Sequence, residues 1–288
     1  MPRRLWLSAI LLAAVAIARD RAAHAAPPFS GTIFIDRDII TASDATTFGG
    51  ATYAGQGTRL MFDRRTNSFS NVSAYLFNAT FSDGRTAEIQ VNPEFGSAAA
   101  ASVEALKYGP VIGRLPSALR DDVRTVWIHK GVQPFGGGNN NLLIHTGQAD
   151  LYAADGILEE TLVHEAAHTS LDAPHAASAG WRAAQAADPD YISTYARDNP
   201  TREDIAESFL PYLALRHRPD RISPALAATI RQTIPNRIAY FDAQAFDVSP
   251  IPEPTAAGII TAVAMTLLTR RTPRGPKVGA TGTPPHNS

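Results

Sequence analysis

Two apolar runs, one near each end of the 288-residue chain, limit the part that can fold as a globular domain. The first run, Leu5–Ala18, follows a basic start and precedes a small-residue pattern at residues 23–25. These three features are typical of a secretory signal peptide. We predict a signal peptide over residues 1–25 and an exported mature chain that begins near residue 26. An uncleaved anchor is the alternative.

The second apolar run, Thr255–Thr269, lies between Pro252-Glu253-Pro254 and a pair of arginines. About fifteen helical residues cover roughly 22 Å, less than the ~30 Å hydrocarbon core of a membrane. The order of tripeptide, apolar stretch and basic stop resembles the PEP-CTERM sorting signal of Gram-negative bacteria. The resemblance implies an exosortase-type processing enzyme as a partner and at least transient membrane contact through residues 250–271. It places the protein in the periplasm, at the cell surface or in the extracellular matrix, and a plain C-terminal anchor is the alternative.

The intervening residues 26–249 have a composition that suits one globular domain. Apolar residues make up 44% and charged residues 18% of the chain, which allows a packed core. A net charge of -1 gives no reason to expect a nucleic-acid partner. The chain has no cysteine, so any metal ion must be held by His, Asp or Glu. The Pro/Gly/Thr-rich tail, residues 272–288, is expected to be disordered.

Hydrophobic patterning predicts an α+β fold with strands first and helices afterwards. Asp155 is a candidate N-cap for a long helix that contains residues 157–169. The glycine and asparagine stretch Gly136–Asn141 is predicted to be a loop. Further strands are expected at residues 32–35, 59–62, 74–81, 87–91, 123–128 and 142–145, and further helices at residues 97–107, 200–215 and 224–232.

The sequence His-Glu-Ala-Ala-His at residues 164–168 falls inside the predicted long helix. Residues four apart lie on one helical face, so the imidazoles of His164 and His168 can converge on one ion. Glu165 lies beside that face and can act as general base on a zinc-bound water. Zinc suits imidazole and carboxylate ligands. The motif predicts a catalytic Zn²⁺ site, and two ordinary histidines are the alternative.

A catalytic zinc needs a third protein ligand and an open position. In the metzincin pattern this ligand is a His at position 174, where this chain has Pro174, so that subclass is disfavoured. Glu203 is one candidate, since it shares a helical face with Glu207 four residues on. His175 is another, if the chain turns back sharply at Pro174.

Residues 164 to about 212 resemble the lethal-factor and Pro-Pro endopeptidase group of zinc metallopeptidases, which are of the gluzincin type. In that group a tyrosine precedes an E-x-x-A-E helix, as Tyr195 precedes Glu203 and Glu207 here. The resemblance implies a zincin-like fold, with a strand-rich N-terminal half followed by the active-site helix and C-terminal helices. It also implies Glu203 as the third metal ligand, Glu207 as a supporting carboxylate and Tyr195 as a hydrogen-bond donor to the oxyanion.

Three further features are weaker candidates for the site. Asp172 and Asp204 are candidate partners for the free N–H groups of the ligand imidazoles, although a helix-end role is the simpler interpretation of both. Asn139–Ile144 is a candidate edge strand beside the zinc helix, where an extended peptide would pair. Trp181 and Tyr191 are candidate walls of the cleft, although aromatic residues at such spacing are more often core.

Together these features predict an exported zinc-dependent metallopeptidase that acts on peptide or protein substrates. One alternative is a zinc hydrolase that acts on a non-peptide amide or on cell-envelope material. Another is a surface or matrix protein in which the metal site is structural.

Overall fold

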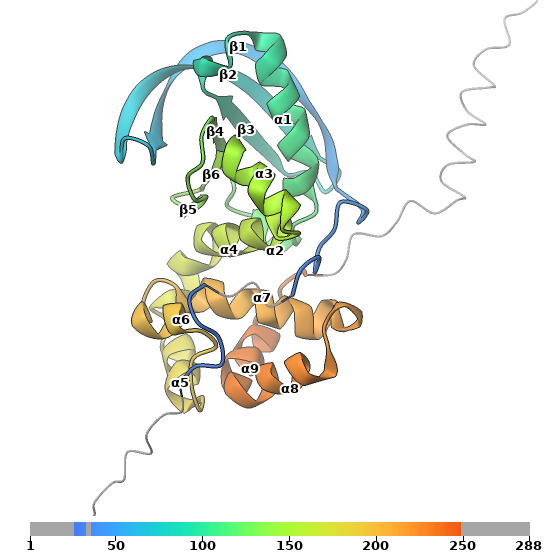
Figure 1. The fold of residues 1–288 in the computed structure, drawn as a ribbon, viewed down its shortest axis with the longest axis vertical. Helices are drawn as coiled ribbons and strands as arrows, with labels where there is room; N and C mark the ends of the chain where they lie inside the picture. Colours follow the sequence, from blue (N-terminus) through green and yellow to red (C-terminus); the bar gives the residue numbers. More distant parts are fainter. Residues whose placement is uncertain (1–25, 33–35, 249–288) are drawn as a thin grey trace, which may run out of the picture.

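The computed structural model describes residues 26–32 and 36–248 (Figure 1). The predicted signal peptide, sorting segment and tail lie outside the described residues, as does most of the strand predicted at 32–35. Within the described ranges no helix has both the length and the apolar character needed to cross a membrane.

The N-terminal half of the described chain forms a six-stranded mixed sheet in the order β1-β2-β3-β4-β6-β5. The pairs β1–β2 and β2–β3 are antiparallel, the pairs β3–β4 and β4–β6 are parallel, and β5 pairs antiparallel with β6 at the edge. The strands are β1 Phe48–Asp63, β2 Ser68–Phe81, β3 Thr86–Val91, β4 Thr125–His129, β5 Gly136–Gly138 and β6 Asn141–His145.

Helices cover the sheet and form most of the C-terminal half. Two capping serines start helices where the sequence predicts them, since Ser97 and Ser223 accept hydrogen bonds from the backbone N–H of the third residue after them. The helices are α1 Ala98–Gly113, α2 Ser117–Arg120, α3 Thr146–Ala154, α4 Leu158–Leu171, α5 Ala179–Ala187, α6 Thr194–Asp198, α7 Asp204–His217, α8 Pro224–Thr233 and α9 Pro235–Gln244, with short turns at Pro93–Phe95, Asp172–Ala176 and Pro219–Arg221. This arrangement confirms the predicted α+β class.

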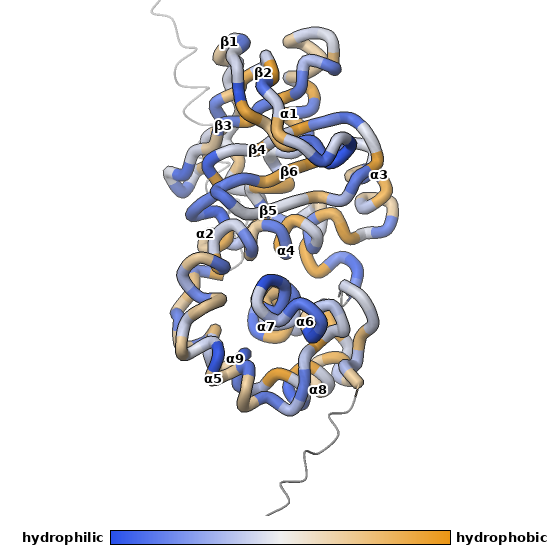
Figure 2. Tube along the Cα trace, turned by 90° about the vertical axis from the view of Figure 1, so that its left-hand side faces the viewer, coloured by the Kyte–Doolittle hydropathy of each residue, from blue (hydrophilic) through white to orange (hydrophobic). Residues whose placement is uncertain are grey.

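Helix α4 lies between the sheet above it and the C-terminal helices below it (Figure 1). One hydrophobic core runs through both parts, from the sheet across α4 to α7 and α9. β6 has a buried apolar centre, Leu142–Ile144, which is orange in Figure 2. On the other side, Phe209 of α7 and Phe241 of α9 pack ring against ring at 5.4 Å. Because α4 is buried from both sides, its polar residues hold fixed positions.

Two local predictions were wrong. Asp155 does not begin the long helix; it follows the end of α3, a helix that the patterning missed, and its N–H donates to Leu151 O at 3.0 Å. Gly156 then adopts a φ of 68°, which glycine tolerates, and α4 begins at Leu158. The stretch Gly136–Asn141 contains strand β5 and the first residue of β6, and is not simply a loop.

The edge strand was also misplaced. Asn139–Ile144 overlaps β6, which has β4 on one side and β5 on the other, so β5 forms the edge of the sheet next to α4. Glycines carry no β-forming side chain, and this explains why the pattern did not identify Gly136–Gly138 as a strand.

Candidate metal centre

Helix α4 brings His164 and His168 together on adjacent turns. Their Nε2 atoms are 3.1 Å apart and their ring centroids 4.8 Å apart. Only 8% of His164 is exposed, and His168 is partly buried. Spacing within a single helix is enough to produce this pair.

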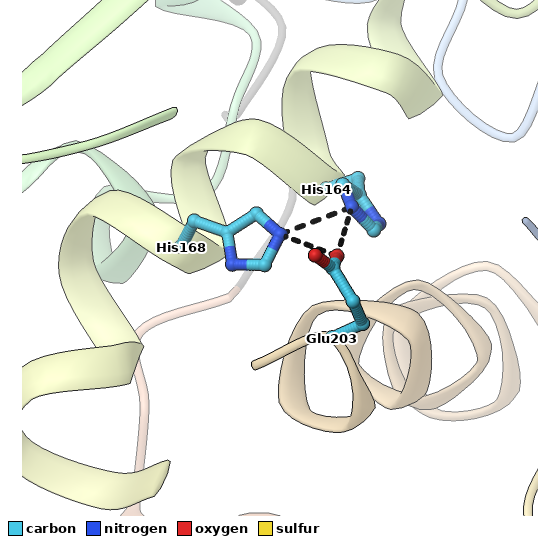
Figure 3. Close-up of side chains that lie close together, drawn as sticks. All are labelled: His164, His168 and Glu203. Carbon is cyan, nitrogen blue, oxygen red and sulfur yellow. Dashed lines mark hydrogen bonds and ion pairs between the residues drawn. The ribbon is translucent and has the colours of Figure 1, made fainter. Parts of the chain in front are cut away.

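Glu203 reaches the same point from a different element. It lies at the start of α7, where its N–H donates to Asn199 O at 2.9 Å. Its Oε2 is 3.0 Å from the Nε2 of His168 and 3.5 Å from the Nε2 of His164 (Figure 3). Among the described residues, these three side chains form a group whose ligand atoms lie close enough together to hold a metal ion.

The donor atoms fit a small tetrahedral ion. Atoms about 2.0–2.1 Å from a tetrahedral zinc ion lie about 3.3 Å from one another. The three observed separations between Nε2 and Oε2 atoms range from 3.0 to 3.5 Å. The spacing of these three donor atoms therefore matches the spacing expected around a tetrahedral metal ion.

Two more carboxylates hold the imidazoles from behind. Asp172 Oδ2 is 2.9 Å from His168 Nδ1, and Glu207 Oε1 is 3.4 Å from His164 Nδ1. Glu207 is fully buried and accepts a hydrogen bond from the Ser193 hydroxyl at 2.6 Å. Partners of this kind fix the ring orientation and would leave Nε2 facing a bound ion. Glu207 therefore lies beside one imidazole of the group, and Asp172 lies beside the other.

The imidazoles and carboxylates at this site shift one another's pKa values. Burial alone would lower the pKa of His168, but hydrogen bonds to Asp172 and Glu203 raise it to about 10. Burial alone would raise the pKa of Glu203, but hydrogen bonds to His164 and His168 hold it well below its usual range. Glu203 is therefore a carboxylate at neutral pH, the form that a metal ligand requires.

Glu165 faces the cleft over the two imidazoles, and β5 passes directly against its backbone. A Cβ atom at Gly137 would lie 1.8 Å from Glu165 O, so only glycine fits at that position. The Thr169 hydroxyl of α4 holds the strands in place, since it donates to Asn141 O of β6 at 2.9 Å and accepts from Gly138 N of β5 at 2.8 Å. The edge strand β5 and helix α4 therefore lie in direct contact beside the cleft.

Tyr195 lies on α6 and lines the same cleft. Burial, together with the negative charge of Glu203, raises the pKa of the phenol to about 12. Tyr195 is thus protonated at neutral pH and able to donate a hydrogen bond.

The cleft over the three ligand candidates has a volume of about 220 Å³. Two of its lining residues, Arg64 and Arg202, had not been singled out from the sequence. Arg202 directly precedes Glu203, so its proximity to that ligand candidate could have been noticed. Arg64 follows β1 at the turn of the β1–β2 hairpin, about a hundred residues before the motif, and no sequence signal connects the two.

His175 is not part of this group. Its Nδ1 is 2.8 Å from the Tyr240 hydroxyl, and its ring packs edge-on against Tyr240 and Phe246. The turn Asp172–Ala176 follows α4, and among the described residues its His175 is not part of the group whose ligand atoms converge. Of the two candidate third ligands, the fold brings Glu203 to the imidazoles.

The remaining candidates belong to a separate buried network around Arg237. Asp204 Oδ2 accepts from Arg237 Nε at 2.9 Å, so among the described residues this carboxylate belongs to the Arg237 network and not to the group around the imidazoles. Trp181 is 1% exposed and packs in the core, so it does not form a wall of the cleft. Tyr191 stacks on the Arg237 guanidinium at 4.7 Å and lines a different pocket.

Comparisons with known proteins add nothing to this geometry. No family model matches the chain, and searches of curated proteins and of solved structures found no match.

Proposed function

We propose that this protein is a zinc-dependent metallopeptidase. The observation that carries the proposal is the convergence of His164, His168 and Glu203 beneath an open cleft that Glu165 also lines. Two imidazoles and one carboxylate form a donor set that suits zinc. When bound, zinc would lower the pKa of a coordinated water and polarise a substrate carbonyl.

The residues of the chain have separate roles in this reaction. Glu165 takes a proton from the attacking water and passes it to the leaving amine. Tyr195 donates a hydrogen bond to the oxyanion that develops on the carbonyl. Asp172 and Glu207 hold the imidazoles in position through their Nδ1 atoms.

A peptide is the substrate best suited to this cleft because a sheet edge borders it. Gly137 of β5 lines the cleft, and β5 pairs with β6 on one side only. An extended peptide could pair with those backbone groups of this edge that are not already bonded to Thr169 or Arg64. A non-peptide amide would gain nothing from that edge.

The geometry gives less support to a structural metal site. A structural zinc is closed by a fourth protein ligand. Within the described residues the candidate group contains three side chains, and His175 bonds to Tyr240 instead. We also propose that the enzyme is exported and sorted through residues 250–271, which lie outside the described residues.

The test is cleavage of a mixed peptide library by the zinc-loaded protein, read by mass spectrometry. Glu165→Gln should keep its zinc content but lose about 10²–10⁴-fold in turnover, because the general base is gone. Asp150→Asn, a carboxylate-to-amide change at an exposed position outside the cleft, is the matched control. Undiminished activity of Glu165→Gln would contradict the proposed role of Glu165 as general base.

A further inference from the structure

The walls of the metal-site cleft are almost entirely polar. No aliphatic side chain lines it; apart from Gly137 and Tyr195, the lining residues are charged or imidazole side chains. An apolar substrate side chain beside the scissile bond would find no apolar surface to bury there. The chemistry of the walls therefore selects for polar or charged substrate groups.

Arg64 lines this cleft with a charge that no carboxylate neutralises within the described part of the chain. One terminal nitrogen of its guanidinium donates to Phe135 O at 2.7 Å, which anchors the side chain beside β5. Its neighbour Arg65 provides a contrast, because Asp63 and Glu94 each lie 2.7 Å from its guanidinium. Arg64 thus keeps donors available for a ligand.

Arg202 lines the cleft from the C-terminal part of the fold. Its side chain is 81% exposed, and its ion pair is a loose contact of 3.9 Å with Glu203 Oε1. Glu203 contacts His164 and His168 through its other oxygen, Oε2, so Arg202 has only this one long contact with the carboxylate. The two arginines therefore approach the candidate metal site from two different parts of the fold.

The position of the charges, more than their sum, favours an anion. With a divalent ion in place, the ion and the two arginines equal the four carboxylates of Glu165, Asp172, Glu203 and Glu207, and Glu207 lies behind His164, outside the cleft. Asp172 is committed to His168 and Glu203 to the ion. An arginine that binds a substrate carboxylate forms charge-assisted hydrogen bonds, which are strong and geometrically specific.

We propose that Arg64 and Arg202 are specificity-determining residues that select substrates with a carboxylate next to the scissile bond. The carboxylate can come from an Asp or Glu side chain or from the C-terminus of a short peptide. This inference rests on the proposed function for its reaction, but the binding of a carboxylate does not require turnover.

The first experiment measures cleavage by the full zinc-loaded chain. Matched peptides carry Glu or Gln around the scissile bond, with both ends blocked, and a third set carries neutral side chains and a free C-terminus. Arg64→Gln and Arg202→Gln should each lower kcat/KM for a carboxylate peptide about 10–100-fold, the range expected for hydrogen bonds to a charged group. The same variants should lower the ratio of kcat/KM for the Glu peptide to kcat/KM for the blocked Gln peptide, since uncharged peptides lack that interaction. Arg124→Gln, which removes an exposed arginine outside the cleft, is the control for net charge.

The second experiment measures binding without turnover. Fluorescently labelled blocked Glu and Gln peptides are titrated into the Glu165→Gln protein, alone and combined with Arg64→Gln or Arg202→Gln. Preferential binding of the Glu peptide that disappears with either arginine supports the proposal even if no peptide is cleaved, in which case only the proposed function fails. Equal cleavage and equal binding of Glu, Gln and free-C-terminus peptides would overturn it, as would an effect of Arg124→Gln equal to that of the two cleft arginines.

Discussion

Asp172 Oδ2 lies 2.9 Å from Nδ1 of His168, one helical turn earlier in the chain. Asp172 is the first residue of the turn that follows α4, so the helix that supplies both imidazoles also supplies a carboxylate partner for one of them. The contact leaves Nε2 of His168 facing Glu203 and His164.

Removal of this carboxylate should weaken metal binding without unfolding the protein. Asp172→Ala is expected to lower zinc affinity about 10–100-fold, because His168 loses the partner that orients its ring. Competition with a chelator of known affinity measures the change, and far-UV circular dichroism checks the fold. An affinity equal to that of the wild type would show that Asp172 does not orient His168.

Zinc content should distinguish the two candidate third ligands. Glu203→Ala should lose near-stoichiometric zinc, because the Oε2 atom that lies 3.0 Å from His168 Nε2 disappears. His175→Ala should keep zinc, because His175 bonds to Tyr240. Elemental analysis of the purified variants gives the answer. Zinc lost with His175→Ala alone would contradict the proposed site.

The stability of the fold should fall at acid pH because of His129. This side chain is fully buried at the end of β4, stacked on His145 at 5.4 Å, and burial lowers its pKa to about 4. Its Nε2 has no hydrogen-bond partner within the described structure. Between pH 6.5 and about 4 the unfolded chain binds a proton that the folded state resists, which removes roughly 3 kcal/mol of stability.

His129→Asn tests this contribution. An asparagine Oδ1 can replace Nδ1 as the acceptor for Asn92, which lies 3.0 Å away, but it does not titrate. Urea unfolding at pH 7.5, 6 and 5 should give a shallower loss of stability in the variant, although its stability at pH 7.5 is lower because of the smaller side chain. Parallel pH profiles for variant and wild type would assign the loss to other groups.

Glu160 should produce a pH dependence of the opposite sign. It is fully buried on α4, and burial raises its pKa to about 7. The unfolded chain loses this proton from about pH 4.5, so stability falls by roughly 3 kcal/mol as the pH rises to 7. Glu160→Gln keeps an oxygen that can accept from Ile40 N and does not ionise. The variant should be more stable than the wild type at pH 8 but not at pH 4; equal stability at pH 8 would refute the assignment.

The local features of the candidate metal site could be predicted from the sequence. His164, Glu165 and His168 belong to one helix, and a four-residue spacing places both imidazoles on one face wherever that helix lies. The strand segments around 74–81 and 87–91 followed from alternation and a turn, and they lie in β2 and β3. These inferences depend only on contacts between residues that are close in the chain.

The tertiary structure decided which distant residues complete the site. Glu203 lies thirty-five residues after His168, and residue spacing alone did not distinguish it from His175. The packing of α7 against the underside of α4 separates them, because it carries Glu203 to the imidazoles while His175 joins Tyr240. The edge strand β5 could not be predicted either, since the glycines that allow its close approach to Glu165 have no side chains to form a pattern. Arg64 enters the cleft only because the long β1–β2 hairpin places its turn beside Phe135. Helical periodicity thus placed the two imidazoles of the motif on one face. Long-range packing determined the third ligand candidate, the strand that borders the cleft and the charge of the cleft walls.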